Sequence, residues 1–227
     1  MKTALVTGAA RGIGRAAAEA LSQSGMRVIG LDRTFADAPG FEKRVYDLTD
    51  LAGIPALVQE IGEIEILVNN AGVQNAVSID RYTDEQRARI LRVNLEAPVE
   101  LIRAVSTPMV ARKRGRIINL ASVAAYTPHT DLWYGVTKAG IVSFTRSFAA
   151  YLGPHGIQVN AVAPGPIDTP LLDNAQPERI EQLMKAVYTR RKGRPEEVAE
   201  AIRWLALDAP PIVNGAIIDI TDGCFLR

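Results

Sequence analysis

The sequence is poor in several residue types, and each shortage excludes a class of function. Cys224 is the only cysteine, so no disulfide can form within the chain, and the cysteine content gives no sign of an oxidising compartment. With only two histidines besides, no His/Cys/carboxylate cluster has metal-ligand spacing, and we expect no catalytic metal. The formal net charge is +1, so the chain lacks the overall field that would attract nucleic acid or an acidic membrane.

Long apolar runs are also missing. No stretch approaches the roughly 20 apolar residues of a transmembrane helix. The first apolar run ends at Val6 and is followed at once by glycines, so we expect neither a signal peptide nor a membrane anchor, and we expect a cytoplasmic protein. The 227 residues are 48% hydrophobic and 22% charged, which are ordinary values for a globular chain. We expect a single domain over residues 1–227.

The most informative stretch of the chain contains Tyr134 and Lys138. Residues four apart lie on one face of a helix, so these two side chains would stand one turn apart. A phenol has a reference pKa of about 10, and a nearby cation favours the phenolate. Tyr134 could then exchange a proton with a substrate hydroxyl. Such a pair also occurs by chance on solvated helices, so the rest of the chain must decide.

A glycine-rich turn near the start of the chain predicts a phosphate site. The apolar run Ala4–Val6 leads into Thr7–Gly14, and a helical stretch follows. Gly8 allows a tight turn, Gly12 allows close approach of a phosphate, and Gly14 allows the helix to pack on the strand. The spacing is G-x-x-x-G-x-G, not the commoner G-x-G-x-x-G. The predicted phosphate-binding residues are Gly8, Arg11, Gly12, Ile13 and Gly14.

Two carboxylates are placed to contact the adenosine part of a dinucleotide. Asp32 follows the second apolar strand, where it can accept hydrogen bonds from both ribose hydroxyls and would repel a 2′-phosphate. This favours NAD over NADP. Arg11 and Arg33 stand near the same place, and we expect them to pack on the adenine or face solvent. Asp47, followed by Leu48, ends the next short strand, and its carboxylate could meet the adenine amino group.

Strands and helices alternate along the chain. This order predicts an α/β fold, a doubly wound, Rossmann-type parallel sheet with helices on both faces, and ligands then bind beyond the carboxyl ends of the strands. The connection between the second and third strands is too short for a full helix. The expected strands are 4–6, 27–31, 43–46, 64–68, 115–120, 157–162 and 216–220, and the expected helices are 15–24, 51–61, 84–112, about 132–152 and 195–207.

Polar or irregular segments follow three of these strands and supply further candidate site residues. Asn69–Gly72 follows the fourth strand, Ser122 follows the fifth, and a stiff loop with three prolines follows the sixth. Exposed backbone groups of that loop could hold the carboxamide and phosphate of a cofactor. The candidate cofactor-binding residues from these segments are Asn69, Ala71, Gly72, Pro164, Gly165, Ile167 and Thr169.

Pro98 lies inside the predicted helix 84–112. Proline has no N–H, so the carbonyl four residues earlier, that of Asn94, loses its helical partner and could accept a hydrogen bond from water. A structural kink alone would also explain the proline.

These motifs together resemble the short-chain dehydrogenase/reductase family, and the resemblance runs from Lys2 to Gly223. It is carried by the glycine turn and by the motifs that follow it in the family's order. These are Asn69-Asn70-Ala71-Gly72, Asn94, Ser122, Tyr134 with Lys138, Pro164-Gly165 and Gly193-Arg194-Pro195-Glu196-Glu197-Val198.

The resemblance implies a role for each member of the catalytic set. Tyr134 would be the general acid/base, and Lys138 would lower its pKa and hold the nicotinamide ribose, so both would also contact the cofactor. Ser122 would hydrogen-bond the substrate oxygen, and Asn94 would anchor a water in a proton relay. The cofactor would supply the hydride. The family commonly forms dimers and tetramers, so the resemblance also implies a homo-oligomer.

The chain departs from the family pattern near the substrate. Ser122 and Tyr134 are 12 positions apart, one fewer than usual, and the lid segment 171–192 is compact. Either a small substrate or a neutral surface change explains this, and the sequence does not rank the two. His129 lies in the shortened loop, where we favour a hydrogen-bonded loop histidine over a substrate contact. The basic residues of the lid are expected to form a solvated face, and they are Arg179, Lys185, Arg190, Arg191 and Lys192.

We therefore expect an NAD-dependent oxidoreductase that acts on a secondary alcohol or ketone. The loop 124–129 is similar to that of dehydrogenases that aromatise dihydro-dihydroxybenzoate, so a cyclic diol or sugar-like small molecule is the expected substrate. The alternative is an NADPH-dependent reductase of 3-oxoacyl thioesters or other carbonyls, with Arg11 and Arg33 at the 2′-phosphate. A catalytically silent NAD-binding sensor is a more remote alternative. The fold does not select the substrate, the direction or the pathway.

Overall fold

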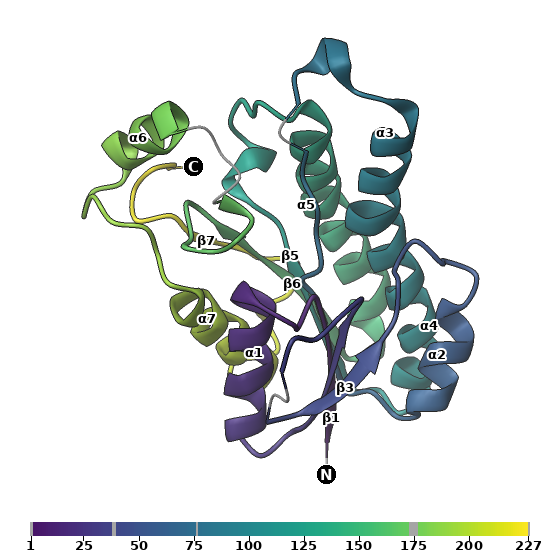
Figure 1. The fold of residues 1–227 in the computed structure, drawn as a ribbon. Coiled ribbons are helices and arrows are strands. Elements are labelled where there is room, and N and C mark those ends of the chain that lie inside the picture. Colours follow the sequence, from purple (N-terminus) through teal and green to yellow (C-terminus); the bar gives the residue numbers. More distant parts are fainter. Residues whose placement is uncertain (1, 38–39, 76, 173–176, 227) are drawn as a thin grey trace.

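A seven-stranded parallel sheet forms the centre of the computed structural model, which describes residues 2–37, 40–75, 77–172 and 177–226 (Figure 1). The strand order is β3-β2-β1-β4-β5-β6-β7, and every neighbouring pair is parallel. The chain reverses its winding between β1 and β4, where such sheets bind ligands. The strands are β1 Thr3–Thr7, β2 Arg27–Asp32, β3 Glu42–Val45, β4 Ile66–Asn69, β5 Gly115–Leu120, β6 Ile157–Pro164 and β7 Ile217–Ile220.

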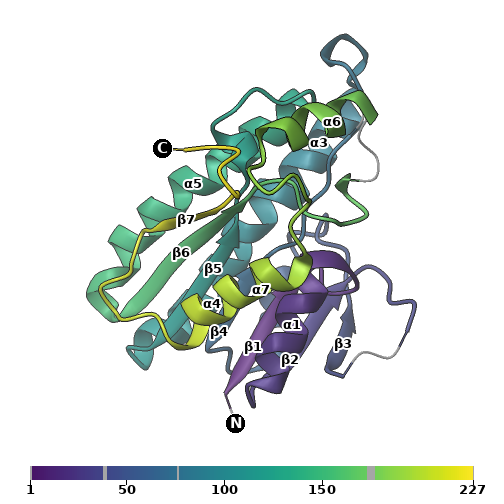
Figure 2. The same ribbon diagram turned by 90° about the vertical axis from the view of Figure 1, so that its left-hand side faces the viewer.

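Helices cover both faces of the sheet, which confirms the predicted fold class. Helices α1 and α7 lie side by side on one face, and α2, α4 and α5 pack on the other (Figure 2). No helix in the described part of the chain combines the length and apolar composition needed to cross a bilayer. The helices are α1 Gly12–Gln23, α2 Ile54–Ile61, α3 Asp84–Leu91, α4 Ala97–Ala111, α5 Leu132–Leu152, α6 Pro177–Ala186 and α7 Pro195–Leu207.

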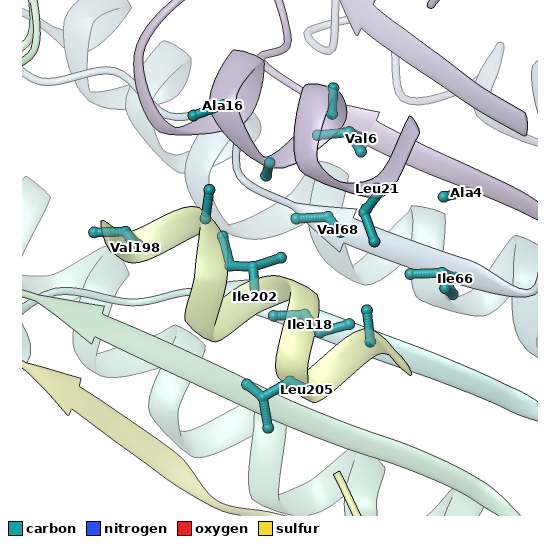
Figure 3. Close-up of a cluster of buried hydrophobic side chains, with 14 of the residues drawn as sticks. Ala4, Val6, Ala16, Leu21, Ile66, Val68, Ile118, Val198, Ile202 and Leu205 are labelled. Atoms are coloured by element: carbon teal, nitrogen blue, oxygen red, sulfur yellow. The ribbon is translucent and has the colours of Figure 1, made fainter. Parts of the chain in front are cut away.

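The two-residue period of the strands divides the core between the two faces. In β1, Val6 points toward α1 and α7, whereas Leu5 points toward the opposite layer of helices. Figure 3 shows Leu21 of α1 and Ile202 of α7 in one apolar cluster over the sheet. Burying each such side chain stabilises the fold by about 1.5–3 kcal/mol. The carboxyl ends of the strands are thus held firmly from both sides.

The predicted single helix 84–112 is wrong, because it is interrupted where Pro98 removes an N–H. Helix α3 ends at Leu91, a π-turn covers Arg92–Glu96, and α4 begins at Ala97, whose N–H donates to the Arg92 carbonyl. Asn94 lies in this widened turn and is fully buried. Pro98 was expected to leave the Asn94 carbonyl without a helical partner, and it lies directly after the π-turn that contains Asn94.

Other predicted boundaries shift by a few residues. Helix α1 begins at Gly12, so the last glycines of the turn already belong to its first turn. The described residues between β2 and β3 form no helix, as predicted. Helix α6 in the lid was not predicted, and it lies toward the carboxyl ends of the strands (Figure 1). Residues 173–176 of the predicted lid lie outside the described residues, as does the side chain of Arg179.

Candidate active site

A cavity of about 990 Å³ opens at the carboxyl ends of the strands. Its lining comes from the glycine turn, the ends of β2, β4, β5 and β6, the start of α5 and the lid. The structure therefore brings together most residues predicted from the sequence. Those in the lining are Gly8, Arg11, Gly12, Ile13, Asp32, Asp47, Leu48, Ala71, Gly72, Ser122, Tyr134, Lys138, Pro164, Gly165, Ile167 and Thr169.

The glycine turn forms a cradle at one end of this cavity. Gly8 and Gly12 have φ angles of +69° and +60°, which residues with a Cβ rarely adopt. A Cβ on Gly8 would lie 2.7 Å from the Asn70 side-chain nitrogen. The first turn of α1 begins at Gly12, so its unpaired N–H groups face the cavity. This geometry fits a dinucleotide phosphate.

Thr7 and Asn70 hold the cradle in place, and sequence reasoning gave neither a role. The Thr7 hydroxyl accepts hydrogen bonds from the backbone N–H groups of Asn70 and Ala71, each at 3.0 Å. The Asn70 side chain donates to the carbonyl oxygens of Thr7 at 2.8 Å and Gly8 at 3.2 Å. Thr7 is a polar residue at the end of an otherwise apolar first strand, and this feature of the sequence could have indicated its role. These bonds lock the glycine turn onto the end of β4.

Two residues predicted to contact the cofactor lie outside the cavity lining. A Cβ on Gly14 would stand 2.2 Å from the Gly8 carbonyl oxygen, so this glycine permits close packing of α1, as its expected packing role requires. Asn69 turns into the sheet, where its side-chain N–H donates to the Asn119 side chain at 2.9 Å. Both residues support the site from behind its surface.

Asp32 is fixed at the rim of the cavity beyond β2. One of its carboxylate oxygens accepts from the Ala10 N–H at 3.0 Å, and the other accepts from the Arg33 N–H at 2.8 Å. The side chains of Arg11 and Arg33 are exposed and line the same end of the cavity. The carboxylate and both guanidinium groups thus face the region expected for the adenosine ribose.

Asp47 lies beside this region with its own set of bonds. Its carboxylate accepts from the Thr49 N–H and the Thr49 hydroxyl, both at 2.9 Å. The bond from the Thr49 backbone contributes most to lowering the pKa of Asp47, and the charges of Arg33 and Arg89 act in the same direction. Arg89 also lines the cavity and was missed from the sequence, because no motif marks it.

Tyr134, Lys138 and Ser122 converge on one wall of the cavity. Tyr134 and Lys138 lie on the first turns of α5, and the Lys138 Nζ atom is 5.4 Å from the centroid of the Tyr134 ring. The ammonium group donates to the Leu120 carbonyl at 2.6 Å. Ser122 follows β5, and its hydroxyl is near enough to the Tyr134 phenol to act on the pKa of that group. The predicted helical spacing therefore brings these groups to one point.

Burial has the largest effect on the pKa values of Tyr134 and Lys138. Burial raises the pKa of Tyr134 to about 12, the Ser122 hydrogen bond opposes that rise, and the charge of Asp131 adds to it. Burial also lowers the pKa of Lys138 to about 7. In the protein chain alone desolvation dominates both groups, and the lowering of the Tyr134 pKa by Lys138 stays a prediction.

Asn94 is buried behind the cavity and does not line it. Its side-chain oxygen accepts from the Val73 N–H at 2.8 Å, and its side-chain nitrogen donates to the Val73 carbonyl at 2.8 Å and the Thr137 hydroxyl at 3.2 Å. The Asn94 side chain therefore ties the loop after β4 to the helix that carries Tyr134. Any contact with a relay water would fall to its backbone carbonyl, and that part stays a prediction.

The loop between Ser122 and Tyr134 adds two groups near the phenol. Asp131 caps α5, where its carboxylate accepts from the Tyr134 N–H at 3.0 Å. His129 accepts a hydrogen bond from the Asp131 N–H at 3.1 Å, as expected for a bonded loop histidine, and its ring also lies 4.8 Å from the Tyr134 ring. Asp131 was missed from the sequence, although an aspartate just before a predicted helix is a known capping signal.

The described basic residues of the lid are paired, and Lys185, Arg190 and Arg191 are exposed as predicted, whereas Lys192 is half-buried. Lys185 lies 2.8 Å from Glu181, Arg191 lies 2.6 Å from Glu197, and Lys192 lies 2.9 Å from Asp168. Arg190 donates to carbonyls at the end of α6. None of these described basic residues lines the cavity, so they contribute no charge to its wall. Among the described residues of the lid, those that line the cavity are the apolar side chains of Leu171, Leu172 and Leu183.

Sequence comparison relates the chain to nicotinamide-dependent enzymes. Residues 8–224 match the family described as enoyl-(acyl carrier protein) reductase. The chain is 38% identical over 240 residues to galactitol 2-dehydrogenase of Rhizobium johnstonii, covering 97% of this chain and 93% of that one. It is 35% identical over 238 residues to 3-oxoacyl-[acyl-carrier-protein] reductase of Haemophilus influenzae, covering 99% and 98% of the two chains.

Two solved structures with the same fold contain bound NADP. A protein from Beutenbergia cavernae, assigned as an NAD(P)-dependent gluconate 5-dehydrogenase and carrying NADP at low occupancy, matches with a TM-score of 0.92 and 31% identity over 98% of this chain and 96% of that one. A protein from Agrobacterium tumefaciens, assigned as a 2-deoxy-D-gluconate 3-dehydrogenase with bound NADP, matches with a TM-score of 0.90 and 28% identity over 100% and 97%.

Proposed function

Because the chain belongs to the short-chain dehydrogenase/reductase family and is an oxidoreductase, we propose that it transfers a hydride between NAD and the secondary alcohol or ketone of a polyol. The observation that carries this proposal is the convergence of Tyr134, Ser122 and Lys138 on a cavity whose other end is the glycine cradle closed by Asp32. Membership of this family makes the chain an enzyme, not a silent cofactor sensor.

The chain's own residues are arranged to hold a dinucleotide along the cavity. The N-terminus of α1 and the backbone of Gly12 hold the pyrophosphate, and Asp32 accepts from the adenosine ribose hydroxyls. Asp47 stands next to the adenine. The loop Pro164–Thr169 faces the nicotinamide end, where its backbone groups hold the carboxamide. When bound, the nicotinamide accepts or supplies the hydride.

The phenol of Tyr134 manages the proton of the reaction. In alcohol oxidation the C–H bond breaks with its electron pair leaving as hydride, a C=O bond forms, and the hydroxyl proton passes to the Tyr134 oxygen. In reduction the same phenol donates its proton to the carbonyl oxygen. Ser122 hydrogen-bonds the substrate oxygen during both, and a charged Lys138 favours the phenolate that oxidation requires. Asn94 keeps the loop after β4 against α5.

A polyol is the substrate that the cavity wall and the relatives favour together. Gln74, Asn75 and Thr127 place uncharged polar groups in the cavity lining beside the His129 ring, and these suit hydroxyl groups. The relative from Rhizobium johnstonii is named for a sugar alcohol.

A second candidate follows from the apolar part of the same wall. Val73, Leu171, Leu172 and Leu183 provide a surface that an acyl chain would contact. Relatives named 3-oxoacyl-[acyl-carrier-protein] reductase share 33–35% identity with the chain. In this case Arg11 and Arg33 would hold the 2′-phosphate of NADPH.

Assembly and location are proposed with the activity. Helices α5 and α7 expose Leu132, Val136, Tyr151 and Trp204, which supports a homodimer or homotetramer formed through these helices. Light scattering after size-exclusion chromatography measures this directly. We also propose a cytoplasmic protein in which residues 1–227 act as one domain with a short lid near 171–192, an extent that limited proteolysis would test.

Nicotinamide absorbance during incubation with a substrate panel tests the proposed function. The panel contains sugar alcohols, cyclic diols and 3-oxoacyl thioesters, each with NAD(H) and NADP(H). Turnover of a polyol with NAD is the expected result. Turnover confined to thioesters with NADPH would replace the proposal with the second candidate, and turnover of polyols with NADP alone would overturn the cofactor assignment.

A further inference from the structure

The carboxylate of Asp131 is buried at the substrate end of the cavity, and the proposed reaction gives it no task. Only 1% of the residue is exposed. Its carboxylate accepts from the N–H of Tyr134 at 3.0 Å and from the N–H of Asn75 at 2.6 Å. The Tyr82 hydroxyl donates to the same carboxylate, with distances of 3.1 and 3.3 Å to its two oxygens. Every neighbour is a donor, which matches a group that only accepts.

These bonds join segments that are far apart in the sequence. Tyr134 is on α5, whereas Asn75 belongs to the loop that follows β4 and Tyr82 stands just before α3. Asn75 also donates from its side chain to the Tyr82 hydroxyl at 2.5 Å. Buried networks of this kind fix geometry only when each member is satisfied, and here each polar contact of the carboxylate is matched.

The loop held by Asp131 forms part of the cavity wall. Each of three successive residues in it is bonded to a different element. Val73 is bonded to Asn94, Gln74 donates to the Leu171 carbonyl of the lid at 2.7 Å, and the Asn75 N–H donates to Asp131. Val73, Gln74 and Asn75 all line the cavity. The carboxylate therefore connects the helix that carries the phenol with the wall that faces the lid.

We propose that Asp131 is a positioning residue that sets both the orientation of Tyr134 and the width of the substrate end of the cavity. It does so by capping α5 while holding Asn75 and Tyr82. This inference rests on the proposed function of Tyr134. The cap lies only three residues before the phenol, in the loop shortened by one residue, so a shift of the cap is passed directly to the reacting oxygen.

Electrostatics gives the same residue a second effect on the phenol. The groups around the Tyr134 ring are the hydroxyl of Ser122, the imidazole of His129, the ammonium of Lys138 and the carboxylate of Asp131. The negative charge of Asp131 contributes to the raised pKa of Tyr134. Its removal should lower that pKa, whereas a purely structural role would leave it unchanged.

Asp131→Asn and Tyr82→Phe are the informative variants. Asparagine still caps a helix, but it presents a donor where the carboxylate presents an acceptor, so it cannot serve Tyr134, Asn75 and Tyr82 together. We expect kcat/KM for the substrate to fall by about 10- to 100-fold in Asp131→Asn. The dissociation constant for the cofactor should stay within about twofold of the wild-type value, since the cradle is distant. The apparent pKa of Tyr134 in the pH profile of the activity should fall by about one pH unit.

A double-mutant cycle tests whether the two residues act through each other. Tyr82→Phe alone should raise KM more than it lowers kcat, and in the Asp131→Asn background it should have little further effect. Asn214→Ala is the matched control. Its side chain accepts from the Val159 N–H at the opposite end of the sheet, so it should lower stability and leave KM and the pH profile unchanged.

Hydrogen exchange gives a readout that does not depend on finding the substrate. Amides of residues 73–82 and the first turn of α5 should exchange faster in Asp131→Asn than in the wild type, and Asn214→Ala should not change them. Unchanged exchange together with an unchanged KM and pH profile would overturn the positioning role. If exchange is faster in Asp131→Asn but the wild-type protein turns over no substrate of the panel, the anchoring network is retained and the proposed function is rejected instead.

Discussion

The Nζ atom of Lys138 lies 5.4 Å from the centroid of the Tyr134 ring and donates to the Leu120 carbonyl at 2.6 Å. Both side chains are buried, with 3% of Lys138 and 8% of Tyr134 exposed. Burial disfavours the charged form of each group, so the pKa of the lysine falls to about 7 and that of the tyrosine rises to about 12. Burial in the folded chain thus favours the neutral form of both Tyr134 and Lys138.

The lowered pKa of Lys138 predicts that stability rises with pH between about 7 and 10. In this window the unfolded chain binds a proton at Lys138 and the folded chain does not, because the unfolded pKa is near 10.4. The free energy of unfolding is therefore highest above the unfolded pKa of Lys138, and it decreases as the pH falls toward 7. The decrease is a few kcal/mol at most. In Lys138→Met, the free energy of unfolding should depend less on pH in this window, as measured by urea unfolding at several pH values.

The matched control for this experiment is Lys185→Met. Lys185 is exposed on α6, where its partner is Glu181 at 2.8 Å. Its replacement should leave the slope between pH 7 and 10 as it is in the wild type. An equal slope in wild type and Lys138→Met would mean that the buried lysine keeps its ordinary pKa.

Tyr134→Phe should lower kcat by about 10²- to 10⁴-fold, the range lost when a general acid/base is removed. Phenylalanine keeps the ring that packs near His129 but cannot exchange a proton. The dissociation constant for the cofactor should change by less than about threefold, because most of the cavity surface is untouched. Tyr151→Phe, at a tyrosine 71% exposed on the same helix, serves as the control. A Tyr134→Phe enzyme with a tenth or more of the wild-type kcat would contradict the assignment.

Asp32→Ala should increase the preference for NADP relative to NAD. The substitution removes the carboxylate that we propose accepts from the ribose hydroxyls and repels a 2′-phosphate, while Arg11 and Arg33 remain at the same end of the cavity. The ratio of kcat/KM for NADP to that for NAD should rise at least tenfold, in line with the loss of one charge-assisted hydrogen bond. Steady-state kinetics with both cofactors measures this ratio. An unchanged ratio would show that Asp32 does not discriminate between them.

The sequence predicted the sheet and the proximity of Tyr134 and Lys138 because both depend on local patterns. Apolar strands of the right period located the sheet, and the four-residue spacing of Tyr134 and Lys138 placed both on one helix face. What it missed depends on contacts between distant segments. Asp131 meets Asn75 and Tyr82 across some 50 residues, and no spacing rule connects them.

Two further features also depend on more than local sequence patterns. Burial, which depends on the whole fold, raises the pKa of Tyr134 to about 12. The turn Arg92–Glu96 was predicted as ordinary helix, because the residue pattern of a π-turn does not differ from that of an α-helix. The expected role of Asn94 at a relay water stays a prediction, and its side chain holds Val73 and Thr137 behind the cavity wall.

Gly14→Ala should destabilise the protein and weaken cofactor binding. Alanine in place of glycine within a helix ordinarily gains up to about 1 kcal/mol. Here the new Cβ would stand 2.2 Å from the Gly8 carbonyl oxygen and 2.3 Å from the Asn70 side-chain nitrogen. A backbone carbonyl cannot rotate away, and overpacking of this kind costs typically 1–3 kcal/mol or more, so the overlap outweighs the gain. We expect a net loss of about 1–2 kcal/mol in the free energy of unfolding.

The same displacement reaches the phosphate cradle, because Gly8 must move to admit the new methyl group. The dissociation constant for NAD, measured by calorimetry, should therefore rise along with the loss of stability. Gly40→Ala is the matched substitution, since a Cβ there would meet nothing within 4 Å. It should change the free energy of unfolding by no more than about 0.5 kcal/mol and leave NAD binding intact. If Gly14→Ala bound NAD as tightly as Gly40→Ala, the close packing of α1 against the glycine turn would not be what shapes the cradle.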